Sequence, residues 1–278
     1  MPELKGRIAL VTGANSGVGL ALTRKLLAAG ASVAALIRSD FPPDDHAATR
    51  AIAEGRLRIY KADLGDFAAL KAALASIKAN EPQLDLVFAN AGVALPDLRR
   101  IAGHDGHFLI NTVVPYIILE ELGPQLEKGA LKTFVATSSI AQAFVKTFSA
   151  GLLDNPDKYV PIFGAYGRSK LALTLWVREA SAAWKSRGIE LRTVCPGGTR
   201  TKMTTGPEAK SFAARFILPL FGHSPEEGAG RLWDAAFAKG SPGDFFSNRK
   251  VVVPRWPETA PAILAQVQAI YEKEYRAP

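Results

Sequence analysis

Two residues of the stretch YGRSK, Tyr166 and Lys170, have side chains that could transfer protons in a suitable site. An isolated tyrosine has a pKa of about 10 and an isolated lysine one of about 10.4, so neither is useful at neutral pH. If the stretch is helical, positions four apart share one face, and both side-chain tips can reach one point. Without further signals, an amphipathic surface pair is the more common explanation, so other motifs must decide.

The composition is that of a globular protein, with 48% hydrophobic and 22% charged residues among 278. Because α/β folds of roughly 200–250 residues are often single domains, we expect one domain over residues 1–278. No apolar run approaches the ~20 residues of a membrane span, and the start MPELKGRIALVTG lacks the pattern of a signal peptide. We therefore expect a cytoplasmic protein with no integral membrane span.

Charge and potential metal ligands disfavour several classes of function. The formal net charge of +8 and the pI of about 9.6 would suit an anionic partner, but the Lys and Arg residues form no basic run, which disfavours nucleic-acid binding. The single cysteine, Cys195, is expected to be a core thiol and not a nucleophile. The four histidines lack metal-ligand spacing, so they are expected to be exposed or hydrogen-bonded and no metal is predicted: His46, His104, His107 and His223.

Short β-rich apolar runs alternate with amphipathic helical stretches, such as 20–30 and 67–80. The runs are continuously apolar, as expected for parallel strands that are covered on both faces. The candidate strands are 7–13, 32–39, 56–64, 84–92, 132–139, 190–198 and 250–254. This order predicts an α/β fold with a doubly wound sheet, whose ligands bind at the carboxyl ends of the strands. Residues 203–223 interrupt the alternation and are expected to form a flap that covers the substrate.

The first βα junction contains TGANSGVG, in which Gly13, Gly17 and Gly19 permit a tight turn and a close approach of phosphate. The helix N-terminus that follows would supply N–H groups and a favourable dipole to a pyrophosphate. Where the second strand ends, NAD enzymes commonly have an acid, but this chain has Arg38, followed shortly by Asp40. Arg38 could bind a 2′-phosphate or be a solvated loop residue. The cation favours NADP(H) over NAD(H) as the cofactor.

Six motifs, in order, make the chain resemble the short-chain dehydrogenase/reductase family over essentially its whole length. They are TGANSGVG, ANAG, Asn111 in FLINTVVPY, VATSS, Tyr166-x-x-x-Lys170 and PGGTRT. YGRSKLAL and SPEEGA are most similar to the retinol-dehydrogenase-like subgroup of lipophilic alcohol and carbonyl oxidoreductases. The resemblance implies a single-domain Rossmann sheet of about seven mostly parallel strands, with helices on both faces.

The resemblance also implies a role for each member of a catalytic set. Tyr166 would be the general acid/base, and Lys170 would lower its pKa by charge and bind the coenzyme ribose. A serine would position the substrate oxygen. Ser138 and Ser139 would point to opposite faces of a strand, and the family pattern favours the second, Ser139. Asn111 would hold a helix backbone open to a water that relays protons to Lys170.

A dinucleotide site is implied along the same edge of the sheet. Asp63 could accept a hydrogen bond from the adenine amino group, and the small residues at 90–92 would lie against a ribose. Thr199 and Thr201 would reach the carboxamide or the pyrophosphate. In full, the expected cofactor-binding residues are Gly13, Asn15, Ser16, Gly17, Val18, Gly19, Arg38, Asp63, Leu64, Asn90, Ala91, Gly92, Tyr166, Lys170, Pro196, Gly197, Thr199 and Thr201.

These expectations describe an NADP-dependent oxidoreductase that transfers a hydride between the nicotinamide and an alcohol or carbonyl group of a small, lipophilic substrate. Two alternatives stay open on the same scaffold. One is a reductase of carbon–carbon double bonds, and the other is a non-catalytic NADP-binding sensor.

Two departures from the family pattern affect these expectations. Ala89 replaces the first Asn of N-N-A-G, while Asn90 is kept. Ser139 and Tyr166 are farther apart than in compact family members, and the extra residues, 148–164, are expected to form a loop beside the substrate mouth. Since a similar insertion blocks dimer formation in some relatives, both a monomer and a homodimer stay open.

Overall fold

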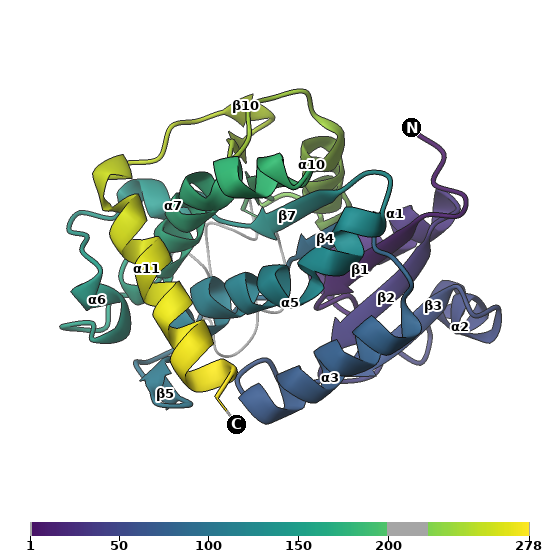
Figure 1. The fold of residues 1–278 in the computed structure, drawn as a ribbon, viewed down its shortest axis with the longest axis horizontal. Helices are drawn as coiled ribbons and strands as arrows, with labels where there is room; N and C mark the ends of the chain where they lie inside the picture. Colours follow the sequence, from purple (N-terminus) through teal and green to yellow (C-terminus); the bar gives the residue numbers. More distant parts are fainter. Residues whose placement is uncertain (1, 199–221, 278) are drawn as a thin grey trace.

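The structure, a computed structural model, describes residues 2–198 and 222–277. Within these ranges an eight-stranded sheet has the order β10-β9-β8-β7-β4-β1-β2-β3 (Figure 1). Its strands are β1 (Ile8–Thr12), β2 (Ser32–Ile37), β3 (Leu57–Lys61), β4 (Leu86–Ala89), β7 (Thr133–Thr137), β8 (Glu190–Cys195), β9 (Phe245–Ser247) and β10 (Lys250–Val251). All neighbouring pairs are parallel except β9 and β10, which confirms the predicted doubly wound α/β class. A separate hairpin consists of β5 (Arg100–Ile101) and β6 (His104–Asp105).

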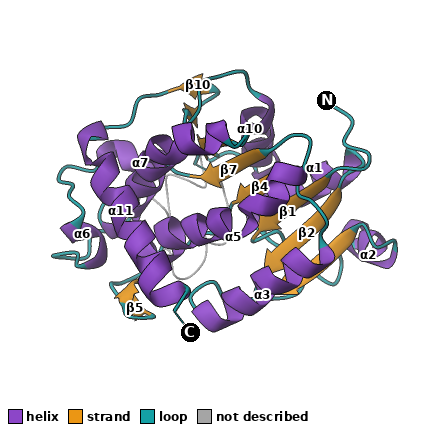
Figure 2. Ribbon diagram, viewed as in Figure 1, coloured by secondary structure: helices purple, strands orange, loops and turns teal. Residues whose placement is uncertain are grey.

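Helices cover both faces of the eight-stranded sheet (Figure 2). One face packs against α1 (Gly17–Ala28), α2 (His46–Ala53) and α10 (Pro225–Phe237), and the other against α3 (Phe67–Asn80), α5 (Val114–Lys128) and α7 (Ala165–Ser186). Helix α11 (Ala260–Ile270) packs against α7 on the outside of this second layer, as Figure 1 shows. Shorter elements are α4 (Gly106–Phe108), α6 (Gly151–Asp154), 3-10 turns at Ile140–Phe144 and Pro257–Thr259, and π-helical turns at Leu109–Val113 and Tyr271–Tyr275.

The central strand β1 shows why the sheet needs both helical layers. Leu10 belongs to the apolar cluster beneath α3, α5 and α7, whereas Ala9 and Val11 belong to the cluster beneath α1 and α10. All three residues are at most 1% exposed. Because successive side chains of a strand point to opposite faces, a strand that is buried on both sides must be apolar throughout.

The last predicted strand is wrong in its position. Residues 250–254 are predicted to form a strand, but only Lys250–Val251 pairs, and it does so antiparallel at the edge of the sheet. The parallel neighbour of β8 is instead Phe245–Ser247. Asn248 and Arg249 have positive φ angles, of 51° and 62°, and form the two-residue turn of a hairpin. A three-residue strand is too short to give a periodic apolar signal, so the sequence pattern does not reveal it.

A buried carboxylate ties three strands together at the amino edge of the sheet. Asp85 is fully buried just before β4. Its side chain accepts hydrogen bonds from the backbone N–H of Ile8 in β1, at 2.9 Å, and from that of Ala130 on the approach to β7, at 2.8 Å. Arg7 lies 3.4 Å away and supplies the opposite charge. Since a buried carboxylate needs these donors, it fixes the strands relative to one another.

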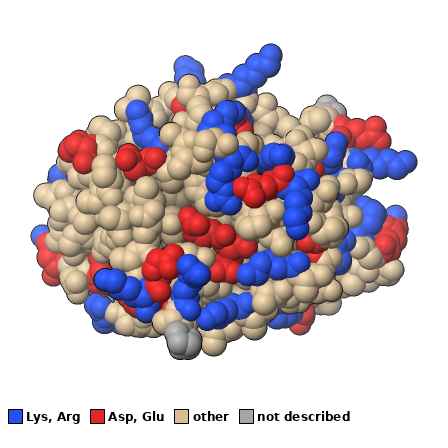
Figure 3. All heavy atoms as spheres, in the orientation of Figure 1, with Lys and Arg blue, Asp and Glu red and all other residues tan. Residues whose placement is uncertain are grey.

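Other predictions concern the whole chain. The described ranges hold no helix that is long and apolar enough to cross a bilayer. Lys and Arg side chains are interleaved with Asp and Glu on the face shown in Figure 3.

A single domain over residues 1–278 stays a prediction. So does the flap at 203–223, which lies outside the described residues except for Gly222 and His223.

Candidate active site

The carboxyl ends of β4 and β7 meet the first turns of α7 at one point of the sheet edge. Lys170, in α7, donates a hydrogen bond to the backbone oxygen of Thr137, the last residue of β7, at 2.8 Å. Gly92, which follows β4, faces the same lysine. A Cβ atom there would lie 3.0 Å from Lys170 Nζ and 2.8 Å from Asn111 Oδ1. Glycine at position 92 therefore lets both side chains approach the backbone, and the structure brings these predicted site residues together.

The two adjacent serines have different partners. Ser138 is buried, and its hydroxyl lies 2.9 Å from the Thr174 hydroxyl of α7. Ser139 is partly exposed, accepts a hydrogen bond from the backbone N–H of Ala141 at 3.2 Å, and is hydrogen-bonded to Tyr166. Ser138 thus serves the packing of α7 on β7, and Ser139 is the hydroxyl that faces the tyrosine.

Burial dominates the acid strength of Tyr166. It raises the pKa of the phenol, and the hydrogen bond with Ser139 offsets this only in part by favouring the ionised form. Cys195, at the end of β8, adds to the increase. The His107 ring packs edge-on against the Tyr166 ring, with the centroids 6.5 Å apart. In this structure the phenol is therefore protonated at neutral pH and able to donate a proton.

Lys170 is only 4% exposed, and its ammonium group has a strongly altered pKa. Desolvation lowers that pKa from 10.5 to about 7. A lysine with such a pKa carries only part of a charge at neutral pH. The predicted lowering of the Tyr166 pKa by Lys170 is not found here: burial of the phenol raises that pKa, and Lys170 is not among the groups that shift it.

Asn111 lies in the π-helical turn Leu109–Val113, between α4 and α5. Its buried side chain accepts a hydrogen bond from the Val93 N–H at 2.9 Å and donates to the Val93 oxygen at 2.9 Å and to Ser169 Oγ at 3.0 Å. A π turn interrupts the regular helical hydrogen bonds and is frequent at functional sites. Asn111 therefore fastens this turn both to the segment after β4 and to α7, next to the buried lysine.

The glycine-rich turn between β1 and α1 has a geometry that fits a dinucleotide. Gly13 and Gly17 have φ angles of 65° and 50°, which favour glycine. A Cβ atom at Gly19 would lie 2.1 Å from the Gly13 oxygen and 2.7 Å from Asn90 Nδ2. Ser16 precedes α1 without capping it through its side chain, and the first turn of α1 has no acidic residue. The N–H groups of that turn therefore suit an anion such as a pyrophosphate.

Hydrogen bonds join the ends of β1, β4 and β7 beside this turn. Asn90 donates to the Thr12 oxygen at 3.1 Å and accepts from the Thr137 hydroxyl at 3.4 Å. The Ala91 N–H donates to the Thr12 hydroxyl at 2.8 Å. Ala89, the departure from N-N-A-G, is buried at the end of β4. The substitution thus leaves Asn90 in position to connect the three strands.

Arg38 is a largely exposed cation at the end of β2, with 78% of its side chain accessible. Its Nη1 lies 3.7 Å from a carboxylate oxygen of Asp63, which is also exposed. Asp40, the other nearby acid, pairs with Lys61 at 2.5 Å, and its backbone oxygen accepts a hydrogen bond from Asn15 at 3.0 Å. Asp40, the acid that follows Arg38 in the sequence, therefore has its own cationic partner.

The other predicted coenzyme residues lie partly outside the described ranges. Val18 is buried in the first turn of α1, and Leu64, after β3, packs against the core. Pro196 directly follows β8. The described part of PGGTRT ends at residue 198, so Thr199 and Thr201 lie outside it.

Two side chains that sequence reasoning missed hold the segment after β4. His107 is buried, and its Nε2 accepts a hydrogen bond from the Leu95 N–H at 3.0 Å, which places the ring proton on Nδ1. Tyr159, in the insertion 148–164, donates to the Leu95 oxygen at 3.1 Å. Leu95 is thus fixed between the helical turn before Asn111 and the insertion. The sequence predicts a hydrogen-bonded or exposed histidine but gives no sign of this partner.

Apolar side chains are exposed in the turn after Ser139 and in the residues before Tyr166. Ile140 and Phe144 are 46% and 56% exposed, and Val160 and Phe163 are 37% and 44% exposed. The rings of Phe144 and Phe163 lie 5.2 Å apart. We call these four residues the apolar rim: Ile140, Phe144, Val160 and Phe163. Two of them, Val160 and Phe163, belong to the insertion 148–164, whose place beside the substrate stays a prediction, and a gathering of exposed apolar side chains is typical of a binding surface.

His104 links the β5–β6 hairpin to the insertion and to the C-terminal segment. Its Nδ1 lies 2.8 Å from Asp154 and its Nε2 lies 2.8 Å from Glu274. Burial alone would lower the pKa of His104, but the hydrogen bonds to the two carboxylates outweigh burial and raise it. In the described part of the chain, no group of three or more His, Cys, Asp or Glu side chains is arranged to hold a metal ion.

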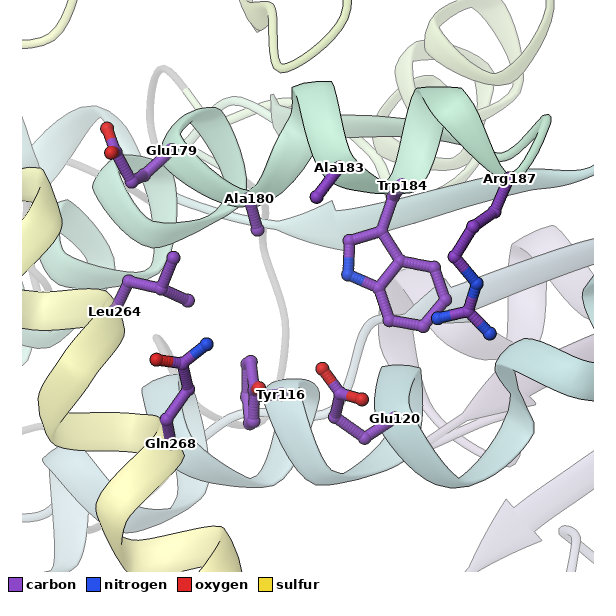
Figure 4. A pocket seen from close by; sticks show the side chains of 9 residues that line it. All are labelled: Tyr116, Glu120, Glu179, Ala180, Ala183, Trp184, Arg187, Leu264 and Gln268. Carbon is purple, nitrogen blue, oxygen red and sulfur yellow. The ribbon is translucent and has the colours of Figure 1, made fainter.

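A separate pocket of about 240 Å³ lies between α5, α7 and α11 (Figure 4). Tyr116 and Glu120 of α5 face Trp184 and Arg187 of α7, and Gln268 of α11 lies at one side. Burial raises the pKa of the Glu120 carboxyl, although its hydrogen bond with Tyr116 acts in the opposite direction. The pocket uses the half of α7 that is remote from Tyr166 and Lys170, so it is separate from the candidate active site.

Known proteins resemble this chain in both sequence and structure. Residues 13–218 match the family model described as Enoyl-(Acyl carrier protein) reductase. Retinol dehydrogenase 12 of Bos taurus is 30% identical over 255 residues, which cover 89% of this chain and 79% of that protein. An NADPH-bound carbonyl reductase from chicken fatty liver has a TM-score of 0.66 and 25% identity, over 90% of this chain and 100% of its own. An NADPH-dependent 3-quinuclidinone reductase from Rhodotorula rubra, 21% identical over 87% of this chain and 90% of its own with a TM-score of 0.66, shares the fold.

Proposed function

Since the chain belongs to the short-chain dehydrogenase/reductase family and is an NAD(P)-dependent oxidoreductase of CH–OH and C=O groups, we propose that it uses NADP(H) to interconvert a small lipophilic alcohol and its carbonyl compound. The observation that carries this proposal is the convergence of Ser139, Tyr166, Lys170 and Asn111 beside the glycine-rich turn. A bound coenzyme supplies or takes up the hydride, while the protein holds the substrate oxygen and moves a proton.

Each catalytic residue has a role that its surroundings support. The Ser139 hydroxyl acts on the Tyr166 hydroxyl and lowers its pKa, so the two side chains together can hold the substrate oxygen. Tyr166, kept protonated by burial, would give its proton to a carbonyl oxygen during reduction. In the oxidation direction it would have to release that proton before it could take one from the alcohol. Lys170, with a pKa of about 7, exchanges protons readily at neutral pH. Its position beside Asn111 supports a path in which a water held at the backbone of that helical turn would relay protons to Lys170.

The surroundings of Arg38 support NADP(H) over NAD(H). Its guanidinium is exposed at the end of β2, where the 2′-phosphate distinguishes the two coenzymes. A planar fork of donors suits that phosphate. Asp40 pairs with Lys61 and so does not take the place of the acid that NAD enzymes use. The similar chicken carbonyl reductase is NADPH-bound.

The apolar rim supports a lipophilic substrate. Four exposed apolar side chains lie in the turn that follows Ser139 and in the residues that precede Tyr166, whose hydroxyls would hold the reacting oxygen. Fully burying a large apolar side chain stabilises a complex by about 1.5–3 kcal/mol, so even partial cover favours an apolar substrate body. The names of the relatives, retinol dehydrogenase and carbonyl reductase, agree with an alcohol or carbonyl compound of this kind.

Reduction of a carbon–carbon double bond is the second candidate, because the matching family model is described as an enoyl reductase. In that reaction the hydride adds to carbon, and Tyr166 would interact with the oxygen of the conjugated carbonyl group. The same residues would therefore serve a different bond of the substrate.

A panel of substrates tests both candidates. We expect apolar aldehydes, ketones or alcohols to be turned over with NADP(H), and faster than with NAD(H), when the nicotinamide absorbance is followed. Turnover of enoyl compounds alone would support the second candidate and contradict the first. Tight NADPH binding without turnover of any compound would support a sensor and contradict both.

A cytoplasmic location and a monomeric or homodimeric state stay predictions, and no nucleic-acid partner is expected. Light scattering of the purified chain with and without NADPH measures the oligomeric state.

A further inference from the structure

A hydrogen-bonded group of three side chains, Arg231, His223 and Glu227, lies against the turn at 196–198 that follows β8. Arg231, in α10, has its Nη2 at 2.9 Å from His223 Nε2 and at 3.2 Å from a carboxylate oxygen of Glu227. His223 Nδ1 lies 2.7 Å from the other oxygen of Glu227. Because an arginine can only donate, His223 Nε2 accepts and its Nδ1 donates to Glu227. His223 Nε2 and a Glu227 oxygen are thus two acceptors that hold the guanidinium in one orientation.

The guanidinium lies directly against the backbone of the turn at 196–198. A Cβ atom at Gly197, whose φ is 91°, would lie 2.4 Å from Arg231 Nη1 and 2.8 Å from His223 Cδ2. The His223 N–H donates to the Gly198 oxygen at 2.8 Å, which fixes the turn against the same group. Glycine at position 197 is thus what allows the cation to reach the edge of the sheet.

Arg231 also has a donor that this group does not use. Its side chain is only 7% exposed, and no described residue accepts a hydrogen bond from its Nε. A buried donor without an acceptor is unfavourable, so the arrangement is better suited to a state in which a ligand supplies acceptors.

The position of Arg231 in the fold favours a negatively charged ligand. The turn lies at the carboxyl end of β8, on the edge where such a sheet binds ligands. Helix α10 packs along α1, whose first turn lacks a side-chain cap and an acidic residue. A cation and a helix N-terminus on neighbouring elements favour a group with two negative charges.

We propose that Arg231 binds the diphosphate of the dinucleotide and that His223 and Glu227 position its guanidinium. This inference rests on the proposed function, because it needs a dinucleotide coenzyme. The diphosphate is present in both NADP(H) and NAD(H), so Arg231 would contact a group that the two coenzymes share. Arg38, by contrast, is expected to contact only the 2′-phosphate. Coenzyme fragments can therefore separate the two arginines.

Two other arginines provide matched controls. Arg192 is equally buried, donates to the Ala235 oxygen at 2.7 Å, and likewise has an Nε without an acceptor among the described residues. It lies within β8 and not at the turn. Arg249 is exposed and pairs with Asp234 of α10 at 2.7 Å. Arg192→Gln controls for the loss of a buried cation, and Arg249→Gln for the loss of a surface charge near α10.

We expect Arg231→Gln to bind NADPH, NADH and ADP-ribose about 10–100-fold more weakly by a common factor, as for one lost charge-assisted contact. Binding of 2′-AMP, which has no diphosphate, should not change. Arg231→Lys, which keeps the charge without the fork, should lose less. Both controls should bind all four ligands like the parent in fluorescence titrations, after thermal melts have shown that each variant folds. In turnover assays, KM for NADPH should rise more than kcat falls.

Several results would overturn the proposal. They are parental affinity of Arg231→Gln for ADP-ribose, equal losses for ADP-ribose and 2′-AMP, or the same ADP-ribose loss in Arg192→Gln. If Arg231→Gln does not fold, Arg231→Lys decides, because a loss confined to diphosphate ligands supports the role and parental affinity contradicts it. A parent protein that binds neither NADPH nor ADP-ribose would instead refute the proposed function itself.

Discussion

The two ends of the candidate site hold their cations in different ways. At the reaction end, Lys170 is 4% exposed, and burial lowers its pKa to about 7. At the adenosine end, the side chain of Arg38 is 78% exposed and lies 3.7 Å from Asp63. A buried ammonium gains and loses its proton near neutral pH, whereas a guanidinium stays charged. The first suits proton transfer, and the second suits recognition of a fixed negative charge.

The largest effect should come from the proton carrier at the reaction end. Tyr166→Phe keeps the ring and removes the hydroxyl, so turnover should fall by about 10²–10⁴-fold while NADPH binding is nearly unchanged. Tyr271→Phe is the matched control, because that hydroxyl bonds to Glu121 on α5, away from the reaction centre. Turnover of Tyr166→Phe within a few-fold of the parent would show that Tyr166 does not carry the proton, and proton transfer would no longer distinguish the reaction end from the adenosine end.

The burial of Lys170 predicts that activity and stability change in opposite directions. Lys170→Met should lose turnover, yet without added coenzyme it should stabilise the fold near pH 7 by a few kcal/mol, to order of magnitude. Up to about pH 7 the lysine is charged in both the folded and the unfolded protein, so the full penalty of burial applies. Between pH 7 and 10.5 the unfolded state alone keeps the proton, and the parent gains stability as pH rises.

Urea unfolding of Lys170→Met and the parent from pH 6 to 10 checks this expectation. The difference in the free energy of unfolding should be largest at low pH and shrink as pH rises. Lys185→Met, at an exposed position of the same helix, should show a small difference with no such trend. A constant difference for Lys170→Met would mean that burial does not control the charge of this lysine.

The adenosine end is tested by Arg38→Ala. Loss of one charge-assisted contact, about 1.5–3 kcal/mol, should weaken NADPH binding by at least tenfold and leave NADH binding within a few-fold. Lys61→Ala removes a neighbouring positive charge and should affect the two coenzymes alike. Equal losses of NADPH and NADH affinity in Arg38→Ala would show that this arginine contributes only general positive potential, and the two ends would then differ less than proposed.

The smallest effect is expected at His104, a histidine whose partners act against burial. Its folded pKa is raised, so the stability from its bonds to Asp154 and Glu274 is fully present below the unfolded value of 6.5 and is lost as pH rises through the folded value. His104→Gln should therefore lower the melting temperature most below pH 6.5, by the equivalent of about 1–2 kcal/mol. The exposed His46→Gln should show no such trend, and a pH-independent loss in His104→Gln would indicate packing alone.

The sequence patterns predict six strands of the sheet, and four of them, β1, β2, β4 and β7, are short runs that are almost wholly buried. The predicted strand β3 lies at the edge of the sheet and is only partly buried. The patterns also predict the amphipathic stretch 67–80, which matches α3 (Phe67–Asn80). This helix begins where it does because the Asp66 side chain caps it, accepting hydrogen bonds from the backbone N–H groups of Ala68 and Ala69. The strand β9 could not be predicted in the same way. Its three residues follow a stretch rich in glycine and proline, and only its pairing with β8 defines it.

The motifs predict which residues lie at the edge of the sheet, and the structure places Ser139, Tyr166, Lys170 and Asn111 together there. Spacing alone could not predict the direction of the Tyr166 pKa, because desolvation depends on everything that packs around the phenol. Nor could it predict the position of Leu95, which is held by side chains 12 and 64 residues away. Such contacts arise only from tertiary packing and leave no local pattern.

The carboxylate of Asp85 has a consequence at the opposite edge of the sheet. It anchors the chain just before β7, the strand that leads to Ser138 and Ser139. Because side chains alternate along a strand, a slip of β7 by one residue would turn Ser138 toward the substrate and Ser139 toward the core. By holding the chain at the start of β7, Asp85 therefore helps to keep Ser139 in register at the carboxyl end of that strand. In a mutational scan, its loss would resemble a catalytic defect although no atom of the reaction centre had been replaced.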